Sequence, residues 1–360
     1  MPKTKSKTGR ILDKVIDFGK QLFASVLRSR TGALTELATL SRFQKGTKGF
    51  ERRYNKLLPL LNEMREAFKI GIMRMLPAGG FRFGIIDDTD IEKSGKNFPK
   101  QQIHHNHKEN SFFSGMKALA SAVYQNGKLA VVNSQIVGKA DNKLEVAKKE
   151  IDRLITDFLV EIFLFDSWYC KNPLIEHIQR SGKIFVSRLR CNNKTEFGED
   201  EVRLDSLARS LDHGQYEHIK IKGKSYWITD LRLTLKAYGE MRVILSKEGQ
   251  HDEPIFLLTN VENFSAKFIV ELYMKRFSIE VFFKDAKQFL NFETFLCRHE
   301  CKWDLHLLLT NVLHWAIQRK NSISKIVRKI RENIDECLLF INENTLLGKF
   351  FEELRKKCQT

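Results

Sequence analysis

The sequence predicts an α/β protein with a mixed sheet, preceded by a basic helical segment and interrupted by a β-rich insertion. Three observations predict this class. Between residues 81 and 190, short apolar runs alternate with helical patterns in the order β-β-β-α-β-α-β, which is typical of an α/β core. Residues 191–260 break this rhythm with short alternating runs between Gly-containing turns. Residues 1–80 show helical periodicity and an excess of basic side chains.

The charge of the chain points to a polyanionic partner. The 360 residues include 61 Lys+Arg and 44 Asp+Glu, which gives a formal net charge of +17. Residues 1–80 hold 17 basic and 6 acidic residues, a net charge of +11. Nucleic acid fits this asymmetry better than a membrane surface. No run of 18 apolar residues predicts a membrane span, no signal peptide is recognisable, and six scattered Cys indicate a reducing compartment.

The first 80 residues are expected to form a small DNA-binding domain. A basic arm covers residues 1–10, and apolar residues recur at helical spacing over 11–28 and 51–75. A helix-turn-helix fits this pattern, but no element carries the signature of a recognition helix.

The α/β core begins with a strand that ends in acids. Phe81–Asp88 is an apolar run that finishes with Asp87 and Asp88, and a second apolar run, Val160–Trp168, contains Asp166 near its end. The other core elements are a hairpin of strands 116–124 and 129–137 turning at Asn126-Gly127, a helix at 142–158, a helix at 173–181 and a strand at 183–190.

A segment without Gly or Pro, residues 265–290, predicts one helix capped by Asn263 or Ser265. Counted at about 100° per residue, four of its residues fall within an arc of roughly 60°. They are Tyr273, Arg276, Glu280 and Lys287. Its apolar stripe, roughly a quarter turn away, consists of Phe268, Leu272, Ile279, Phe283, Ala286 and Leu290. A solvated face with surface ion pairs is the simpler alternative for the four polar residues.

Three acids are therefore candidates for one site. Residues that leave strand ends gather at one edge of an α/β sheet, so Asp87 or Asp88 would lie near Asp166, and Glu280 would join them if its helix covers that edge. Such a cluster repels itself unless cations are bound. Two Mg²⁺ or Mn²⁺ ions suit carboxylate ligands and support phosphoryl transfer. Arg276 and Lys287 would hold DNA phosphates beside them.

Together these motifs resemble a known family. Ile-Ile-Asp87-Asp-Thr89-Asp-Ile, then Phe-Asp166-Ser-Trp-Tyr, then the spacing of Tyr273, Arg276, Glu280 and Lys287 are similar to the DDE transposases of bacterial insertion sequences. The Tyr-Arg-Glu-Lys pattern resembles the insertion-sequence-4 group. The resemblance runs from about Phe81 to Trp315.

The resemblance implies an RNase H-like core and a Mg²⁺-dependent enzyme that nicks transposon ends and joins the freed 3′-hydroxyl to target DNA. It assigns metal-ligand roles to Asp87, Asp166 and Glu280, with Asp88 as the alternative to Asp87. It assigns contacts with transposon-end phosphates to Tyr273, Arg276 and Lys287. It further implies terminal inverted repeats as the double-stranded DNA partner, a homodimer on DNA, and a bacterial cytoplasmic, nucleoid-associated location.

The expected organisation has five parts. They are a helical DNA-binding domain at 1–80, the core at 81–190, the β-rich insertion at 191–260, the second part of the core with the glutamate helix at 261–320, and a helical tail available for dimerisation at 321–360.

Other candidate sites have weaker patterns. His104, His105 and His107 fit an exposed polar loop better than a metal or phosphate site. The spacing of Cys297, His299 and Cys301 is too close for zinc. Trp227 fits a strand residue over the core of the insertion better than a base-stacking residue.

The function has two alternatives. One is an RNase H-like endonuclease without strand transfer, and the other is an inactive transposase-derived DNA-binding protein.

Overall fold

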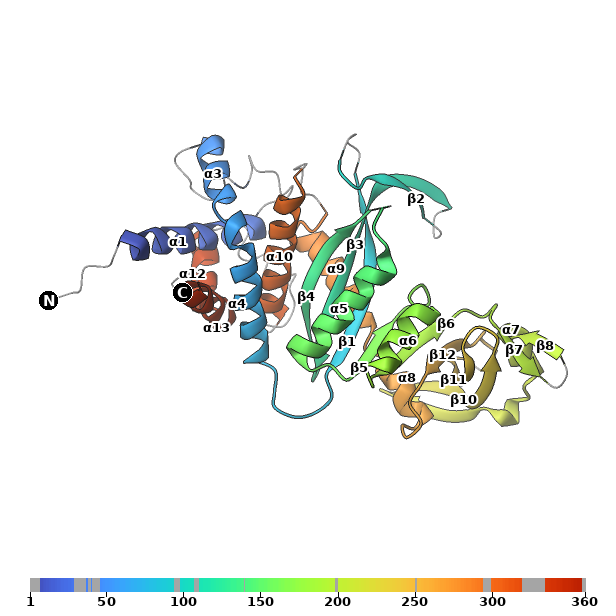
Figure 1. Ribbon diagram of the computed structural model, residues 1–360. Helices are drawn as coiled ribbons and strands as arrows, with labels where there is room; N and C mark the ends of the chain where they lie inside the picture. The colour runs from blue at the N-terminus through green and yellow to red at the C-terminus, as the bar shows by residue number, and fades with distance from the viewer. Residues whose placement is uncertain are drawn as a thin grey trace.

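The computed structural model describes residues 7–28, 37, 40, 46–93, 98–106, 110–138, 140–197, 200–249, 251–293, 299–318 and 334–357. Figure 1 shows three neighbouring parts: a group of helices that contains both ends of the described chain, a central sheet, and a smaller β-rich part on the side away from the helices. The expected basic arm at 1–10 therefore falls largely outside the described residues.

Six strands form the core of the sheet: β1 (Phe83–Glu92), β2 (Gln102–Asn106), β3 (Ser111–Gln125), β4 (Lys128–Val137), β5 (Ile162–Phe165) and β6 (Ile184–Leu189). β1 runs parallel to β5, and β5 runs parallel to β6, so that Ile85, Leu164 and Val186 lie side by side. β3 pairs antiparallel with β1, β2 and β4. The sheet is mixed, as the sequence predicted.

The hairpin between β3 and β4 confirms the strongest turn signal of the sequence. Asn126 has φ 49° and Gly127 has φ 78°, the left-handed values that a two-residue type I′ turn requires. Strand β3 begins at Ser111, earlier than expected, because it also pairs with β2.

Helices cover both faces of the core sheet. On one face lie α5 (Lys143–Phe158) and α6 (Asn172–Arg180), whose apolar side chains belong to the same cluster as Ile86 and Phe163 of the sheet. The side chain of Asn142 caps α5 by accepting hydrogen bonds from two backbone amides of its first turn. On the other face, the cluster around Ile85 and Leu164 includes residues of α8 (Ala266–Met274) and α9 (Phe277–Phe289).

The expected single helix at 265–290 is instead the pair α8 and α9. Ser265 caps α8, as predicted, by accepting a hydrogen bond from the amide of Phe268. Between the two helices, the amides of Arg276, Ser278 and Ile279 each bond the carbonyl three residues earlier, not four. This tighter 3₁₀-type turn separates the helices without Gly or Pro, so composition gave no sign of it. The predicted apolar stripe faces the core, and its members Leu272, Ile279, Phe283 and Ala286 are buried.

The insertion extends the same sheet. Its strands are β7 (Lys194–Phe197), β8 (Asp200–Arg203), β9 (Glu217–Ile221), β10 (Lys224–Leu235), β11 (Gly239–Lys247) and β12 (Ile255–Thr259), with the helical turns α7 (Leu204–Ser210) and η2 (His213–Gln215). β12 pairs antiparallel with β6, so that one sheet runs from the core into the insertion. Trp227 lies on β10, with its ring 4.8 Å from that of His218, and packs partly against the core, as a strand residue.

The remaining helices pack together although they come from opposite parts of the chain. They are α1 (Lys7–Arg28), α3 (Gly46–Asn55), η1 (Leu58–Leu60), α4 (Leu61–Met73), α10 (Glu300–Ile317), α12 (Ile334–Glu343) and α13 (Thr345–Lys357). Phe23 of α1 makes edge-on ring contacts with Phe350 and Phe351 of α13, at 5.9 and 5.6 Å between centroids. The glutamate Glu353 of α13 accepts a hydrogen bond from Arg74, directly after α4. In Figure 1 these helices form one group beside the sheet. The boundaries at 1–80 and 321–360 stay predictions.

Two further local expectations were wrong. The segment 51–75 is not one helix, because Pro59 falls in its middle, where it removes a hydrogen-bond donor and separates α3 from α4. The polar loop expected around the histidines contains strand β2, in which His104 pairs with Phe113 and His105 pairs with Phe112. His107 lies outside the described residues.

Candidate active site

Strand alternation places Asp87 and Asp88 on opposite faces of the sheet. Ile85 belongs to the apolar cluster that contains α8 and α9, whereas Ile86 belongs to the cluster that contains α5. Because side chains alternate along a strand, Asp87 follows Ile85 to the α9 face and Asp88 follows Ile86 to the α5 face. Only Asp87 shares a face with the helix that carries Glu280.

The strand register brings Asp166 beside Asp87. Leu164 lies next to Ile85 in the parallel pair β1–β5, so the residues two positions further along, Asp166 and Asp87, leave neighbouring strands on the same face. Neighbouring strands are about 4.8 Å apart. The charge of Asp166 accordingly contributes to raising the pKa of Asp87.

Helix α9 carries the third acid, Glu280, and an arginine links it to Asp87. The Arg276 guanidinium donates a hydrogen bond from Nη1 to Asp87 Oδ2 at 2.7 Å and another from Nη2 to Glu280 Oε1 at 2.5 Å. Its side chain is only 7% exposed, whereas that of Glu280 is 47% exposed. Arg276 therefore connects an acid of the sheet with an acid of the helix.

Burial dominates the ionisation of Asp87. Loss of solvent raises the pKa of this carboxyl from 3.8 to about 7, although the positive charge of Arg276 acts in the opposite direction. Burial also raises the pKa of the Tyr273 hydroxyl to about 12. Tyr273 is 3% exposed and lies beneath the arginine, with the guanidinium carbon 5.5 Å from its ring centre.

The three residues expected to contact DNA phosphates are engaged within the protein. Tyr273 and Arg276 are buried. Lys287 Nζ donates a hydrogen bond to the carbonyl of Asp90 at 2.5 Å and forms an ion pair with Glu293 at 3.0 Å. Arg276 and Lys287 would have to exchange these partners in order to hold a phosphate.

Asp88 belongs to a separate network on the α5 face. Its Oδ1 accepts hydrogen bonds from Lys143 Nζ at 2.6 Å and from the Tyr169 hydroxyl at 2.7 Å. The Lys143 ammonium also lies 3.3 Å from the ring centre of Trp168, a cation–π contact. The turn that carries Asp166 closes through a hydrogen bond from the Tyr169 amide to the Asp166 carbonyl at 3.0 Å. Asp88 lies within β1, which continues to Glu92, and Asp166 directly follows β5, so the network holds both acid-bearing segments from the α5 face.

The donor chemistry of the site suits a hard divalent cation, but the present arrangement does not form a cation site. Carboxylate oxygens are the ligands that Mg²⁺ and Mn²⁺ prefer. Within the described part of the chain, no three His, Cys, Asp or Glu side chains lie close enough together to share one ion. Arg276 holds one oxygen of Asp87 and one of Glu280. The acids fit a cation only after Arg276 has released them.

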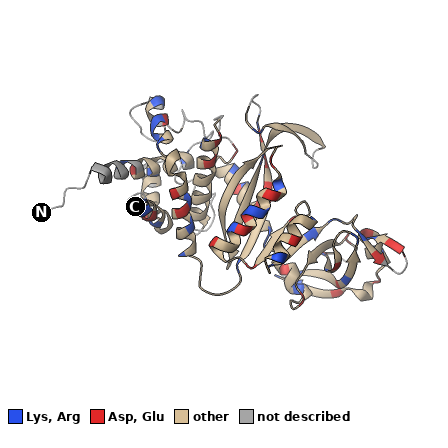
Figure 2. Ribbon diagram, viewed as in Figure 1, with Lys and Arg blue, Asp and Glu red and all other residues tan. Residues whose placement is uncertain are grey.

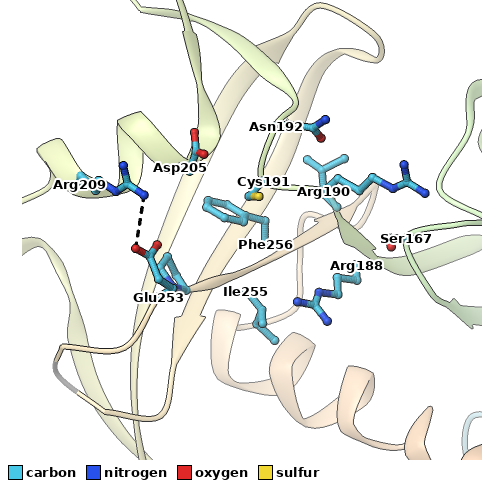
Figure 3. A pocket seen from close by; sticks show the side chains of 12 residues that line it. Ser167, Arg188, Arg190, Cys191, Asn192, Asp205, Arg209, Glu253, Ile255 and Phe256 are labelled. Atoms are coloured by element: carbon cyan, nitrogen blue, oxygen red, sulfur yellow. Dashed lines mark ion pairs between the residues drawn. The ribbon is translucent and has the colours of Figure 1, made fainter. Parts of the chain in front are cut away.

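A groove of about 890 Å³ opens beside the turn that follows Asp166 and was not expected from the sequence. Figure 3 shows Arg188 and Arg190 along one side of it and the ion pair of Arg209 with Glu253 along the other. Ser167, which follows Asp166, also lines it. The sequence does show two arginines at alternate positions, Arg188 and Arg190, at the end of the predicted strand at 183–190. They indicate a site beside Asp166 only once β6 is known to lie next to β5.

The weaker candidates gain no support. His104 is buried, its ring stacks on Phe113 at 5.2 Å, and burial lowers its pKa. The Cys297 position lies outside the described residues, and Cys301 is exposed.

Comparison with known proteins gives the family. A family model described as Transposase DDE domain matches residues 78–313, about two thirds of the chain. The chain belongs to the DDE transposases. No curated protein matches the transposase. The matched region runs from just before β1 into α10 and includes all three candidate acids, and the mixed sheet is consistent with an RNase H-like transposase domain.

Membership of this family makes the protein a nuclease and transposase by class, with DNA as its partner. None of the helices in the described ranges has the length and apolar character needed to span a membrane.

Proposed function

We propose that the transposase binds the two ends of a mobile element, cleaves them by metal-dependent phosphoryl transfer, and joins the freed 3′-hydroxyl to target DNA. The observation that carries this proposal is the link between three distant acids. Asp87 and Asp166 leave adjacent strands on one face, and Arg276 joins Asp87 to Glu280 on that same face. A buried carboxyl with a raised pKa, such as that of Asp87, among other charged groups is typical of a functional site.

The proposed roles follow from the position of each group. Asp87, Asp166 and Glu280 would hold two Mg²⁺ or Mn²⁺ ions, which supply an activated attacking oxygen and stabilisation of the leaving oxygen when bound. Arg276, once released from the acids, would reach a phosphate of the transposon end, with Lys287 and Tyr273 beside it. The spacing of these residues supports the insertion-sequence-4 group.

The partners of the proposed reaction are DNA and a second copy of the protein. The substrate would be double-stranded terminal inverted repeats, followed by target DNA, and two ends held together require at least two copies. Helix α13 packs Phe350 and Phe351 against α1, so the proposal of a dimer rests on the two DNA ends and not on a free tail. A nucleoid-associated location in the bacterial cytoplasm goes with this role.

Basic helices outside the catalytic core support DNA binding. Figure 2 shows Lys and Arg on α3, and in sequence these are Lys48, Arg52 and Arg53. Lys48 and Arg52 are exposed, and exposed charge of this kind provides the salt-dependent part of DNA affinity.

The test is a gel assay with Mg²⁺ and the terminal repeats that flank the gene. The wild type is expected to give nicked and joined products. Replacement Glu280→Gln removes a proposed ligand charge and should lower cleavage by at least about 100-fold while leaving DNA binding intact. The matched control, Glu271→Gln on α8, should retain full activity.

Other outcomes would change the assignment. Cuts without joined products would identify an endonuclease without strand transfer. Binding without cuts would identify an inactive DNA-binding descendant. Undiminished cleavage by the Glu280→Gln protein would remove Glu280 from the site.

A further inference from the structure

The side chains that line the groove carry an unbalanced positive charge. Arg188 and Arg190 are exposed and lie two residues apart, so their side chains leave β6 on the same face. Their backbone carbonyls accept hydrogen bonds, but neither guanidinium has an ion pair or hydrogen bond with any residue that the structure describes. A guanidinium group can donate two parallel hydrogen bonds to one anion. Two unpaired guanidinium groups on one wall of a groove therefore favour an anion with several oxygens.

The acids of the groove are already neutralised. Glu253 pairs with Arg209 at 3.5 Å, and Asp205 pairs with Arg203 at 2.6 Å. These four charges cancel in pairs, so the net charge that faces a ligand is that of the two free arginines. The groove also offers polar groups from Ser167 and Asn192.

The position of Arg188 ties the groove to the candidate active site. Val186 lies next to Leu164 in the parallel pair β5–β6, and two residues further along each strand stand Arg188 and Asp166. Asp87, Asp166 and Arg188 thus form a row across three neighbouring strands, on the face that α8 and α9 cover. The charges of both Asp166 and Arg188 act on the pKa of Tyr273, as expected for groups around one centre.

We propose that this groove binds a DNA strand next to the point of cleavage, with Arg188 and Arg190 each holding a backbone phosphate. The inference rests on the proposed function, because the acids beside the groove are assigned there to phosphodiester cleavage. The strand passes the acids and continues along β6 toward the insertion, so the insertion serves as the second wall of the substrate path.

The proposed contacts of the two arginines are with backbone phosphates and not with bases. Arginine forks bind two phosphate oxygens at once, and each lost phosphate contact changes the salt dependence of binding by a known increment. The groove therefore contributes affinity that falls as salt rises and does not discriminate between base sequences.

The first measurement is binding of a fluorescein-labelled single strand of mixed sequence, without divalent ions, over a range of salt concentrations. The double variant Arg188→Gln/Arg190→Gln should bind more weakly, with a log–log salt slope shallower by about 1.4. The control double variant, Arg180→Gln/Arg232→Gln, removes the same charge from exposed positions away from the groove and should keep the wild-type slope. An equal loss in both variants, or in neither, would overturn the proposal.

A native thiol supplies a local reporter. Cys191 is exposed and lines the groove. The same strand carrying an activated disulfide on one internal phosphate should form a cross-link that is lost in Cys191→Ser and retained in Cys301→Ser. The arginine double variant should reduce its yield. A cross-link that survives in Cys191→Ser, or none at all under binding conditions, would place the strand elsewhere.

The two proposals fail separately. The binding and cross-linking measurements are made without metal and do not depend on cleavage. An absence of cleavage in the Mg²⁺ gel assay would refute the proposed reaction but not the proposal for the groove. Normal cleavage together with an unchanged salt slope and no Cys191 cross-link would refute the groove alone. Both arginines are exposed, so their replacement should leave the midpoint of thermal unfolding unchanged, and a thermal unfolding experiment checks this.

Discussion

Asp87 holds a carboxyl group almost out of water, with 15% of its side chain exposed. Burial favours its protonated form, while Arg276 favours its charged form, and burial has the larger effect. An acid in such a place lowers the stability of the folded chain near neutral pH. A residue kept at that cost is typical of a functional site.

This balance predicts a pH-dependent stability difference between the wild type and Asp87→Asn. The folded pKa, about 7, lies above the ordinary value of 3.8, so the folded protein binds the extra proton between these values. The stability contributed by that proton is fully present below pH 3.8 and is lost as pH rises through 7. Relative to the variant, the wild type should lose up to about 1.4 kcal/mol per pH unit in this window. Denaturant unfolding at several pH values, without divalent ions, measures the difference, and parallel profiles would contradict it.

Some residues of the candidate site could be identified from the sequence, whereas others could not. An apolar run that ends in acids is visible in the chain, so Asp87 and Asp166 were identifiable, and helical spacing grouped Arg276 with Glu280. That Arg276 holds both Asp87 and Glu280 was not predictable, because it depends on how α9 packs over the sheet. Arg188 escaped notice for the same kind of reason, since its neighbour Asp166 lies on another strand.

Among elements, those with local signals were predicted well. The Asn126-Gly127 turn and the helix expected at 142–158 are encoded by nearby residues, and the structure confirms both. The division of 265–290 into α8 and α9 was missed because helical periodicity continues through it. The signal for β2 was also missed, since an edge strand of polar residues resembles a loop until its partner β3 is known.

Gly115 provides a test at this scale. It is the residue at which β3 changes from pairing with β2 to pairing with β1. A Cβ atom there would lie 2.3 Å from the carbonyl oxygen of Ile91, so Gly115→Ala must push two backbones apart. The expected cost is about 1–3 kcal/mol in the free energy of unfolding.

The control for this test is Gly71→Ala in α4, where a Cβ meets nothing within 4 Å. That change should be neutral or stabilise by up to about 1 kcal/mol, because Ala favours a helix over Gly. Urea unfolding of both variants measures the change in the free energy of unfolding for each. Similar changes for the two would show that β1 and β3 accommodate a Cβ at position 115 without cost.

At the scale of the whole molecule, one sheet joins the core to the insertion, and helices from both ends of the described chain pack together. The sequence showed apolar faces on these helices but not which faces meet, because amphipathic periodicity identifies a buried side and not its partner. The same limit applies to the insertion, whose strand β12 pairs with β6 of the core.

Phe350→Ala tests the joint helical group. Phe350 is 2% exposed and contacts Phe23 of α1, so its truncation should cost about 3–5 kcal/mol and loosen α1. Chemical unfolding measures the cost, and limited proteolysis within 7–28 reports the loosening. The control, Phe112→Ala, removes a ring that is 74% exposed and should change stability by less than about 0.5 kcal/mol. Protection of α1 that is unchanged in Phe350→Ala would show that α1 is held by other contacts.

The packing of α1 against α12 and α13 has a consequence for synthesis on the ribosome. Translation proceeds from the amino end, and segments generally fold as they emerge. The acids at 87, 166 and 280 leave the ribosome before residues 334–357 do, so a nascent chain would contain the three candidate acids while α1 still lacked its apolar partners on α13. The helical group can therefore be completed only after residues 334–357 have been translated, later than all three acids.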